Sequence, residues 1–292
     1  MNFINGLKKT LPCPWLDLAL EGRKDNLSQL KAISSYLSAN YLGYNSLINN
    51  FKNNLAPSTF QANKDLLKDY YLKSPVDLNR EILVRRNDHG LSFCPFCGNP
   101  KKPDTLDHFI PKDSWPEFSI FPNNLVPQCR GCAPIKGENY FCHTSTMVKF
   151  IHPLYFDFIN HYRYKINVAF DRATSKASFT LSLKKIHPTT TEHDNRVKLH
   201  FKNLKIRSRV EKYCQEEFRR WSARISKQRF NILEAFNQKI AELPSDEVGK
   251  DWESAFCYAM RSNTGIIEYL NSLRPANHVV TEVIEVGNLE LD

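Results

Sequence analysis

The feature that most constrains this chain is a set of four cysteines arranged in two Cys-x-x-Cys pairs. Cys94 and Cys97 form the first pair, Cys129 and Cys132 form the second, and 31 residues separate the two pairs. This spacing is typical of zinc sites, in which each pair makes a tight turn and four thiolates surround one ion at about 2.3 Å. Such a metal stabilises a module that has little core of its own. We therefore predict a structural Zn²⁺ held by all four side chains.

The composition is that of a folded protein. Hydrophobic residues make up 41% of the 292 residues, which is enough for a sizeable core and excludes global disorder. No apolar run approaches the roughly 18 residues that cross a bilayer, and the first residues lack the hydrophobic segment of a signal peptide. We expect a soluble, cytoplasmic protein with no membrane partner. The cysteines outside the pairs are interpreted as small buried hydrophobic residues: Cys13, Cys142, Cys214 and Cys257.

Positive charge is concentrated in one stretch of the sequence. Residues 196–240 contain 13 basic and 4 acidic side chains, whereas residues 241–292 contain 3 and 10. A focused basic stretch is suited to contacts with phosphates, although a solvated helix face can have the same composition. The candidate nucleic-acid contacts in this stretch are Arg207, Arg209, Arg219, Arg220, Arg224 and Arg229.

Apolar spacing predicts helices on both sides of the cysteine pairs. Apolar side chains lie three or four positions apart in parts of residues 1–89 and again in residues 194–241, as in amphipathic helices. A further short helix is predicted over residues 251–273. Residues 163–185 instead alternate between apolar and polar side chains, and this period of two predicts a β-hairpin with its turn between Asp171 and Lys176.

An Asp-His dipeptide lies between the two cysteine pairs. The carboxylate of Asp107 can hold a divalent cation, and the imidazole of His108 can take a proton from water near pH 7. Together with a phosphodiester, these groups are the components of metal-assisted hydrolysis. A plain zinc ribbon with a surface histidine is the alternative interpretation of the same residues.

Five elements follow one another over residues 92–141: Cys-x-x-Cys, Asp-His-x-x-Pro, Asn-Leu-Val, a second Cys-x-x-Cys and Lys-Gly. In this order they resemble HNH endonucleases that combine a zinc ribbon with the ββα-metal fold. The resemblance covers about one sixth of the chain. It implies hydrolysis of a DNA phosphodiester bond that leaves 5′-phosphate and 3′-hydroxyl ends.

The resemblance also implies roles for individual residues. Asp107 would be a ligand of the catalytic divalent metal, Mg²⁺ or Mn²⁺, and His108 would be the general base that activates water. Asn124, from the Asn-Leu-Val element, would tie down the loop and orient His108. The four cysteines would hold the structural zinc away from the chemistry.

Ala133 departs from the pattern of that family. The residue after the last cysteine is usually Asn or His there, the second protein ligand of the catalytic metal, whereas alanine has no donor atom. Three interpretations compete: an engineered inactive form, which we favour, a naturally inactive binding protein, or replacement of the ligand by another donor such as His143. We expect the chain with Ala133 to be nearly inactive and Ala133→Asn to be active.

The fold class expected from these features is α+β. The chain should be mostly helical, with a Cys₄-zinc ββα-metal module and a separate β-hairpin inserted between helical parts. The expected regions are a helical part at 1–89, the module at 90–141, a linker with the hairpin at 142–195, and a basic helical part with an acidic tail at 196–292.

A wider resemblance concerns the parts around the module. The helical N-terminal part, the Pro-Glu-Phe-Ser-Ile segment and the His-Pro-x-Tyr-Phe element are similar to HNH proteins of bacterial antiphage systems. In Septu-type systems and related retrons the nuclease works with an ABC-type ATPase. Since this sequence has no nucleotide-binding loop, that ATPase would be another chain. Double-stranded DNA is the expected substrate. A non-catalytic zinc-ribbon subunit that binds nucleic acid or assembles a complex, and an RNA-cutting nuclease, remain as alternatives.

Overall fold

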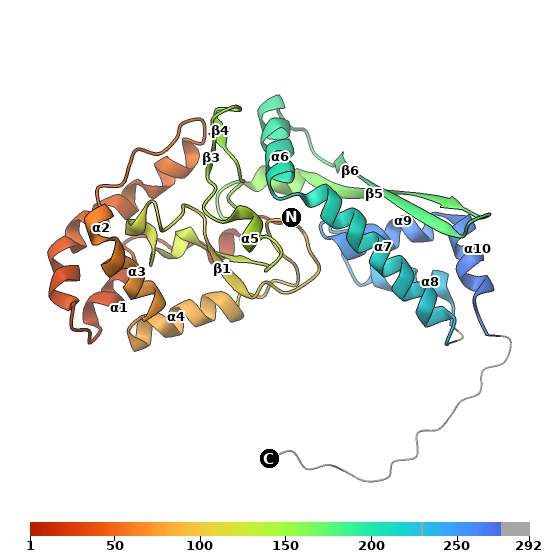
Figure 1. Cartoon of the computed structure of the whole chain (residues 1–292), viewed down its shortest axis with the longest axis horizontal. Helices are drawn as coiled ribbons and strands as arrows, with labels where there is room; N and C mark the ends of the chain where they lie inside the picture. The colour runs from red at the N-terminus through yellow and green to blue at the C-terminus, as the bar shows by residue number, and fades with distance from the viewer. Residues whose placement is uncertain (229, 276–292) are drawn as a thin grey trace, which may run out of the picture.

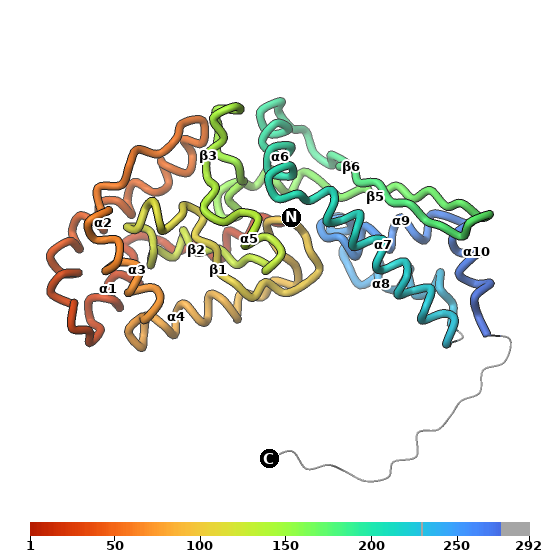
Figure 2. The backbone as a smooth tube through the Cα atoms, in the orientation of Figure 1, coloured from red at the N-terminus to blue at the C-terminus, as the bar shows by residue number. Residues whose placement is uncertain are grey.

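The computed structural model describes residues 1–228 and 230–275 (Figure 1). Helices dominate these residues, and the strands form two-stranded antiparallel sheets that are separate from one another. The N-terminal helices gather around the central module, whereas the long hairpin and the later helices form the other end of the molecule (Figures 1 and 2). This arrangement confirms the predicted α+β class.

The N-terminal helices form one wall of the module. They are η1 (Asn5–Leu7), α1 (Pro14–Glu21), α2 (Leu27–Asn49), η2 (Gln61–Asn63), α3 (Lys64–Leu72) and α4 (Val76–Asn87). Along α2 the buried side chains recur at helical spacing, so one face of the helix packs inward. Tyr41 stacks on Phe121 with ring centroids 4.4 Å apart, and Tyr44 meets Phe118 edge-on at 5.0 Å. These contacts hold α2 against the loop between the two strands of the module.

The central module contains two short strands followed by a single helical turn. Its elements are β1 (Thr105–His108), η3 (Pro116–Phe118), η4 (Pro122–Asn124), β2 (Leu125–Gln128) and α5 (Ala133–Lys136), followed by the small pair β3 (Phe141–Cys142) and β4 (Met147–Val148). β1 and β2 are antiparallel, with Asp107 opposite Val126 and His108 opposite Leu125. The single turn of α5 begins directly after the second cysteine pair.

The hairpin and the C-terminal helices complete the described chain. They are η5 (Asp157–His161), β5 (Tyr162–Asp171), β6 (Lys176–Lys185), α6 (Thr191–Asn203), α7 (Ile206–Ile225), α8 (Ile232–Ala241), α9 (Trp252–Arg261) and α10 (Thr264–Ser272). The register from Tyr162 opposite Lys185 to Asp171 opposite Lys176 confirms the predicted hairpin and its turn. One face of the hairpin packs on α7 and α9.

The helical segment predicted over residues 194–241 is divided into three helices. α6 and α7 are separated at Lys205, whose backbone is left-handed with φ of 51° and so cannot continue a right-handed helix. α8 starts anew after Asn231, whose side chain accepts a hydrogen bond from the Glu234 backbone. The predicted apolar stripe of α7 is nevertheless buried along its whole length: Val210, Cys214, Phe218, Trp221 and Ile225.

The short helix predicted over residues 251–273 is likewise divided, into α9 and α10. Asn263 caps α10 by accepting a hydrogen bond from the backbone of Ile266. The last residues, 276–292, where the sequence also suggests a strand or a tail over residues 278–286, lie outside the described residues together with four of the ten acidic side chains of residues 241–292. In the part of the chain that is described, no helix is both long and apolar enough to cross a membrane.

Candidate functional site

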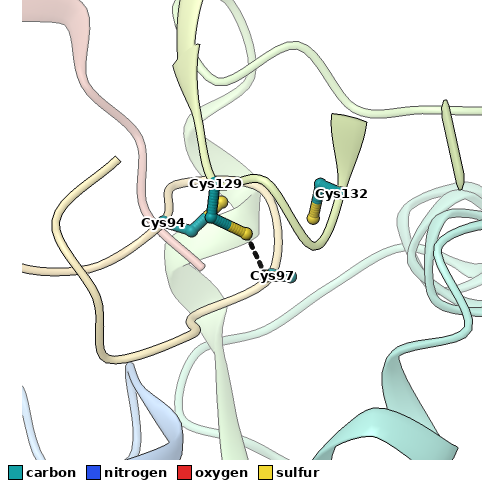
Figure 3. Close-up of side chains that lie close together, drawn as sticks. All are labelled: Cys94, Cys97, Cys129 and Cys132. Atoms are coloured by element: carbon teal, nitrogen blue, oxygen red, sulfur yellow. Dashed lines mark hydrogen bonds between the residues drawn. The ribbon is translucent and has the colours of Figure 1, made fainter. Parts of the chain in front are cut away.

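The four paired cysteines converge on one buried point (Figure 3). Their sulfur atoms all lie within 4.8 Å of one another, and Cys97 Sγ is 3.7 Å from Cys129 Sγ. Four sulfurs placed tetrahedrally at about 2.3 Å from a zinc ion are separated by about 3.8 Å, whereas a disulfide needs about 2.05 Å. The spacing therefore fits a tetrathiolate metal ion such as zinc.

Arg209 on α7 reaches the same cluster. Its Nη1 lies 3.3 Å from Cys132 Sγ, and its Nη2 lies 3.5 Å from Cys97 Sγ and 3.8 Å from Cys129 Sγ. Burial lowers the pKa of Arg209, but the negative charge of Cys97 and Cys132 raises it by more, so the net shift is upward. The guanidinium is thus a fixed positive charge beside the four sulfurs.

Asp107 forms an ion pair inside the module. Its Oδ1 lies 3.1 Å from Nζ of Lys136, which also donates a 3.0 Å hydrogen bond to the His108 carbonyl. The Lys136 side chain is 0% exposed and that of Asp107 is 10% exposed. Burial raises the pKa of Asp107, while the charge of Lys136 partly opposes this shift. The second carboxylate oxygen, Oδ2, is buried with no hydrogen-bond partner among the described residues.

His108 is oriented by a backbone contact. Its Nε2 lies 3.0 Å from the Ser119 carbonyl, so the Nε2–H tautomer donates there and leaves Nδ1 with a free lone pair. Tyr71 on α3 packs edge-on against the ring, with centroids 4.4 Å apart. Burial lowers the pKa of His108 to about 3, which keeps the imidazole neutral at pH 7. The ring is thus neutral and oriented, and the same burial makes it a weak base, because a general base is most effective when its pKa lies near the working pH.

Asn124 anchors the loop that follows His108. Its Oδ1 accepts hydrogen bonds from the Ile110 backbone (2.7 Å) and from Tyr44 Oη (2.8 Å). Its Nδ2 donates to the carbonyls of Ile110 (3.0 Å) and Phe118 (3.1 Å). The side chain is completely buried. The amide thus ties the loop from Ile110 to Phe118 together and links it to α2.

The surroundings of Asp107 fit a catalytic divalent metal poorly. Among the described residues, the cysteine cluster is the only group of three or more His, Cys, Asp or Glu side chains that lie close enough to share one metal ion. Ala133 begins α5 and has no donor atom, and His143 is exposed in the turn between β3 and β4. The carboxylate of Asp107 is already paired with an ammonium group. Of the predicted ligands, only Asp107 could contribute to such a metal here.

The predicted nucleic-acid contacts differ in their surroundings. Arg207, Arg219 and Arg224 are exposed on α7, and Arg224 also lies over the Trp221 ring at 4.7 Å. Arg220 is exposed and forms an ion pair with Glu217 at 2.5 Å. Arg209 is half-buried and faces the cysteines, and Arg229 lies outside the described residues. The exposed arginines remain predictions for phosphate contact, while Arg209 is committed to the cluster.

Sequence reasoning missed two residues of this site. Lys136 belongs to the Lys-Gly element, but lysine is rarely buried, and its ion pair with Asp107 was not expected. A signal was present, because Lys136 lies three positions after Ala133 and so faces the same side of the helix. Tyr44, which donates to Asn124, comes from a distant helix, and its stripe of apolar neighbours gave no sign of this hydrogen bond.

The chain is similar to protein ea31 of Escherichia phage lambda, with 37% identity over 84 residues. The match covers 27% of this chain and 28% of that protein, so less than a third of either chain is aligned with the other. No family model matches the chain. No solved structure matches it either.

Proposed function

We propose that this protein is an endonuclease of the HNH type, directed at DNA phosphodiester bonds and nearly inactive with Ala133. The observation that carries the proposal is the arrangement around His108. The imidazole keeps one nitrogen free, and three hydrogen bonds between Asn124 and the backbone of Ile110 and Phe118 hold the loop behind it. A zinc ribbon that only binds nucleic acid has no need of an oriented neutral base next to a carboxylate.

The residues of the chain suggest how hydrolysis would proceed. Nδ1 of His108 takes a proton from a water molecule, which then attacks the phosphorus atom. The Ser119 carbonyl holds the Nε2–H and thereby stabilises the ring as it becomes positively charged. The bond from phosphorus to the leaving 3′ oxygen breaks, and protonation of that oxygen gives the 3′-hydroxyl product.

The chemistry that a bound divalent metal would supply there is Lewis-acid polarisation of the phosphoryl group and stabilisation of the leaving oxygen. Asp107 would hold that ion in the active form of the site. With Ala133 the second protein ligand is lacking, and Lys136 already neutralises part of the carboxylate. Because the metal would lack a second protein ligand, we expect this chain to have low activity. Ala133→Asn would add one amide oxygen on α5, the helix that also carries Lys136.

A basic groove supports a nucleic-acid substrate. It lies between β6 and the junction of α6 with α7 and has a volume of about 620 Å³. Exposed cationic side chains line it: Lys198, Lys202, Lys205 and Arg207. Its lining includes a single acidic side chain, Glu211, and an apolar floor formed by Leu181, Leu183 and Phe201. Because each phosphate contact releases counterions, affinity that depends on this groove should fall with salt.

A non-catalytic subunit that binds nucleic acid is the second candidate. The missing donor at Ala133 and the buried Asp107–Lys136 pair both favour it, because the carboxylate is already partly neutralised and the described residues bring no group of metal donors together around it. In that case the cysteine cluster and the basic groove would be the functional features, and His108 with Asn124 would be structural.

A cleavage assay on supercoiled plasmid with Mg²⁺ or Mn²⁺ separates the two candidates. We expect Ala133→Asn to nick or linearise the plasmid, and the unaltered chain and Ala133→Asn/His108→Ala to leave it intact. Ala133→Leu is the matched control, since leucine has nearly the shape of asparagine but no donor atom. Strong cleavage by the unaltered chain or by the His108→Ala double variant would contradict the proposal. A parallel RNA substrate tests the third possibility, cleavage of RNA.

We further propose a role in antiphage defence together with an ABC-type ATPase supplied by another chain. Its support is the sequence resemblance described above. Copurification from the host, followed by mass measurement of the complex, tests this: a single species at 33.9 kDa with no ATPase would count against it.

A further inference from the structure

The first cysteine pair is a meeting point of segments that are distant in sequence. The Cys97 carbonyl accepts hydrogen bonds from Tyr164 Oη on β5, at 2.6 Å, and from the Trp252 indole on α9. The Gly98 carbonyl accepts a 3.0 Å hydrogen bond from the Trp252 backbone. Gly98 has φ of +68°, and a Cβ there would lie 2.7 Å from the Tyr164 ring. The turn from Cys94 to Gly98 is therefore packed tightly against both C-terminal elements.

Arg209 adds a charged contact from α7 to the same place. Its guanidinium touches three sulfurs from both cysteine pairs and lies over the Trp252 ring at 5.4 Å. Gly131 leaves room for it, because a Cβ at that position would lie 2.7 Å from Nη2. The side chain thus bridges the metal-binding turns of the module and the helices of the C-terminal part.

We infer that the cysteine cluster is the joint by which a bound metal docks α7, α9 and the hairpin onto the module, with Arg209 as its fixed counter-charge. Four thiolates around a divalent ion leave a net charge of −2 in a buried place, and one guanidinium halves it. The planar fork of arginine presents its N–H donors to several sulfurs in a fixed geometry, whereas the ammonium of a lysine is a compact charge on a flexible stem. The inference needs a metal on the cysteines but does not depend on nuclease activity.

Metal retention is the first test, with Arg209→Met compared against Arg207→Met. Arg207 lies two positions away on the same helix, is exposed, and lines the basic groove instead. Partners that hydrogen-bond metal ligands typically contribute 10–100-fold to metal affinity. We expect Arg209→Met to weaken zinc binding by about that factor in a chelator competition, Arg209→Lys to fall between, and Arg207→Met to have no effect.

Nucleic-acid affinity, measured on the same variants, gives the opposite pattern. Arg207→Met should weaken binding to a DNA fragment and lower its salt dependence, whereas zinc-loaded Arg209→Met should bind as the unaltered chain does. If Arg209→Met instead keeps its zinc and loses nucleic-acid affinity as Arg207→Met does, the inference is overturned and Arg209 belongs to the phosphate-binding surface.

Hydrogen exchange on the full chain tests the joint itself. Stepwise removal of zinc by a chelator should increase exchange in α7, in α9 and in the turn from Cys94 to Gly98, while α1 and α2 keep their protection. Unchanged exchange in α7 and α9 after metal removal would overturn the inference. So would an equal loss of protection across α1 and α2, because the cluster would then support the whole fold rather than this joint.

Discussion

Replacing Lys136 by methionine removes the only cation that contacts the Asp107 carboxylate among the described residues. Methionine keeps much of the apolar stem and can fill the space near the rings of Phe109 and Phe150, whose centroids lie 5.8 Å and 5.6 Å from Lys136 Nζ, so packing changes little. Removing one member of a buried ion pair typically costs about 3–5 kcal/mol, because the other charge remains without compensation. The hydrogen bond to the His108 carbonyl adds about 1 kcal/mol. Because Asp107 can become neutral by taking up a proton, we expect the lower end of this range: Lys136→Met should reduce the free energy of unfolding by about 3 kcal/mol at pH 7.5.

The assay is urea unfolding of the zinc-loaded chain, followed by tryptophan fluorescence. Asp107→Asn/Lys136→Met removes both charges and should recover most of the loss, because replacing a whole buried pair is often nearly neutral. Lys198→Met, at an exposed position, is the matched control and should change stability by less than about 0.5 kcal/mol. A loss below about 1 kcal/mol for Lys136→Met, or strict additivity of the two single changes, would refute an energetically coupled pair.

Two further predictions concern buried polar groups. His200 donates to the Phe96 carbonyl at 2.7 Å, and burial lowers its pKa from 6.5 to about 4. Its contribution to stability should be complete above pH 6.5 and should be lost as the pH falls toward 4, which lowers the free energy of unfolding by about 3 kcal/mol in all. The free energy of unfolding measured against pH should show this decrease. An equally steep decrease in His200→Gln would contradict the assignment to His200. Asn124→Ala removes four hydrogen bonds and should destabilise the chain by about 3 kcal/mol in urea unfolding. Asn124→Asp keeps the acceptor contacts but turns a buried carboxylate oxygen toward the Ile110 and Phe118 carbonyls, so it should destabilise the chain at least as much as Asn124→Ala; a clearly smaller loss would argue against the donor contacts.

Features encoded in a short stretch of sequence were predictable. The hairpin follows from the alternation of apolar and polar side chains over residues 163–185, and the cysteine cluster follows from the spacing of its pairs. The breaks within the helical segments were missed, although Asn231 and Asn263 are residue types that commonly cap helices. The break at Lys205 carried no such signal, because a left-handed lysine has no characteristic sequence pattern.

Contacts between distant segments could not be predicted from the sequence. Basic residues are mostly exposed, so the positive stretch was interpreted as a surface for phosphates. Two of its arginines instead face inward: Arg209 meets the cysteines, and Arg196 lies 3.8 Å above the Phe51 ring. The packing of the helices on the module decides which basic side chains face inward. Because this packing depends on the whole fold, no local sequence pattern indicates it.

The close fit of Arg209 against Gly131 links two positions that no local motif connects. Any side chain at position 131 would push the guanidinium away from the sulfurs. Among homologous chains, glycine between the second pair of cysteines should therefore accompany arginine at the position of Arg209, and larger residues there should accompany its loss. The composition of a metal-binding turn would then be selected partly by a helix that begins more than seventy residues later.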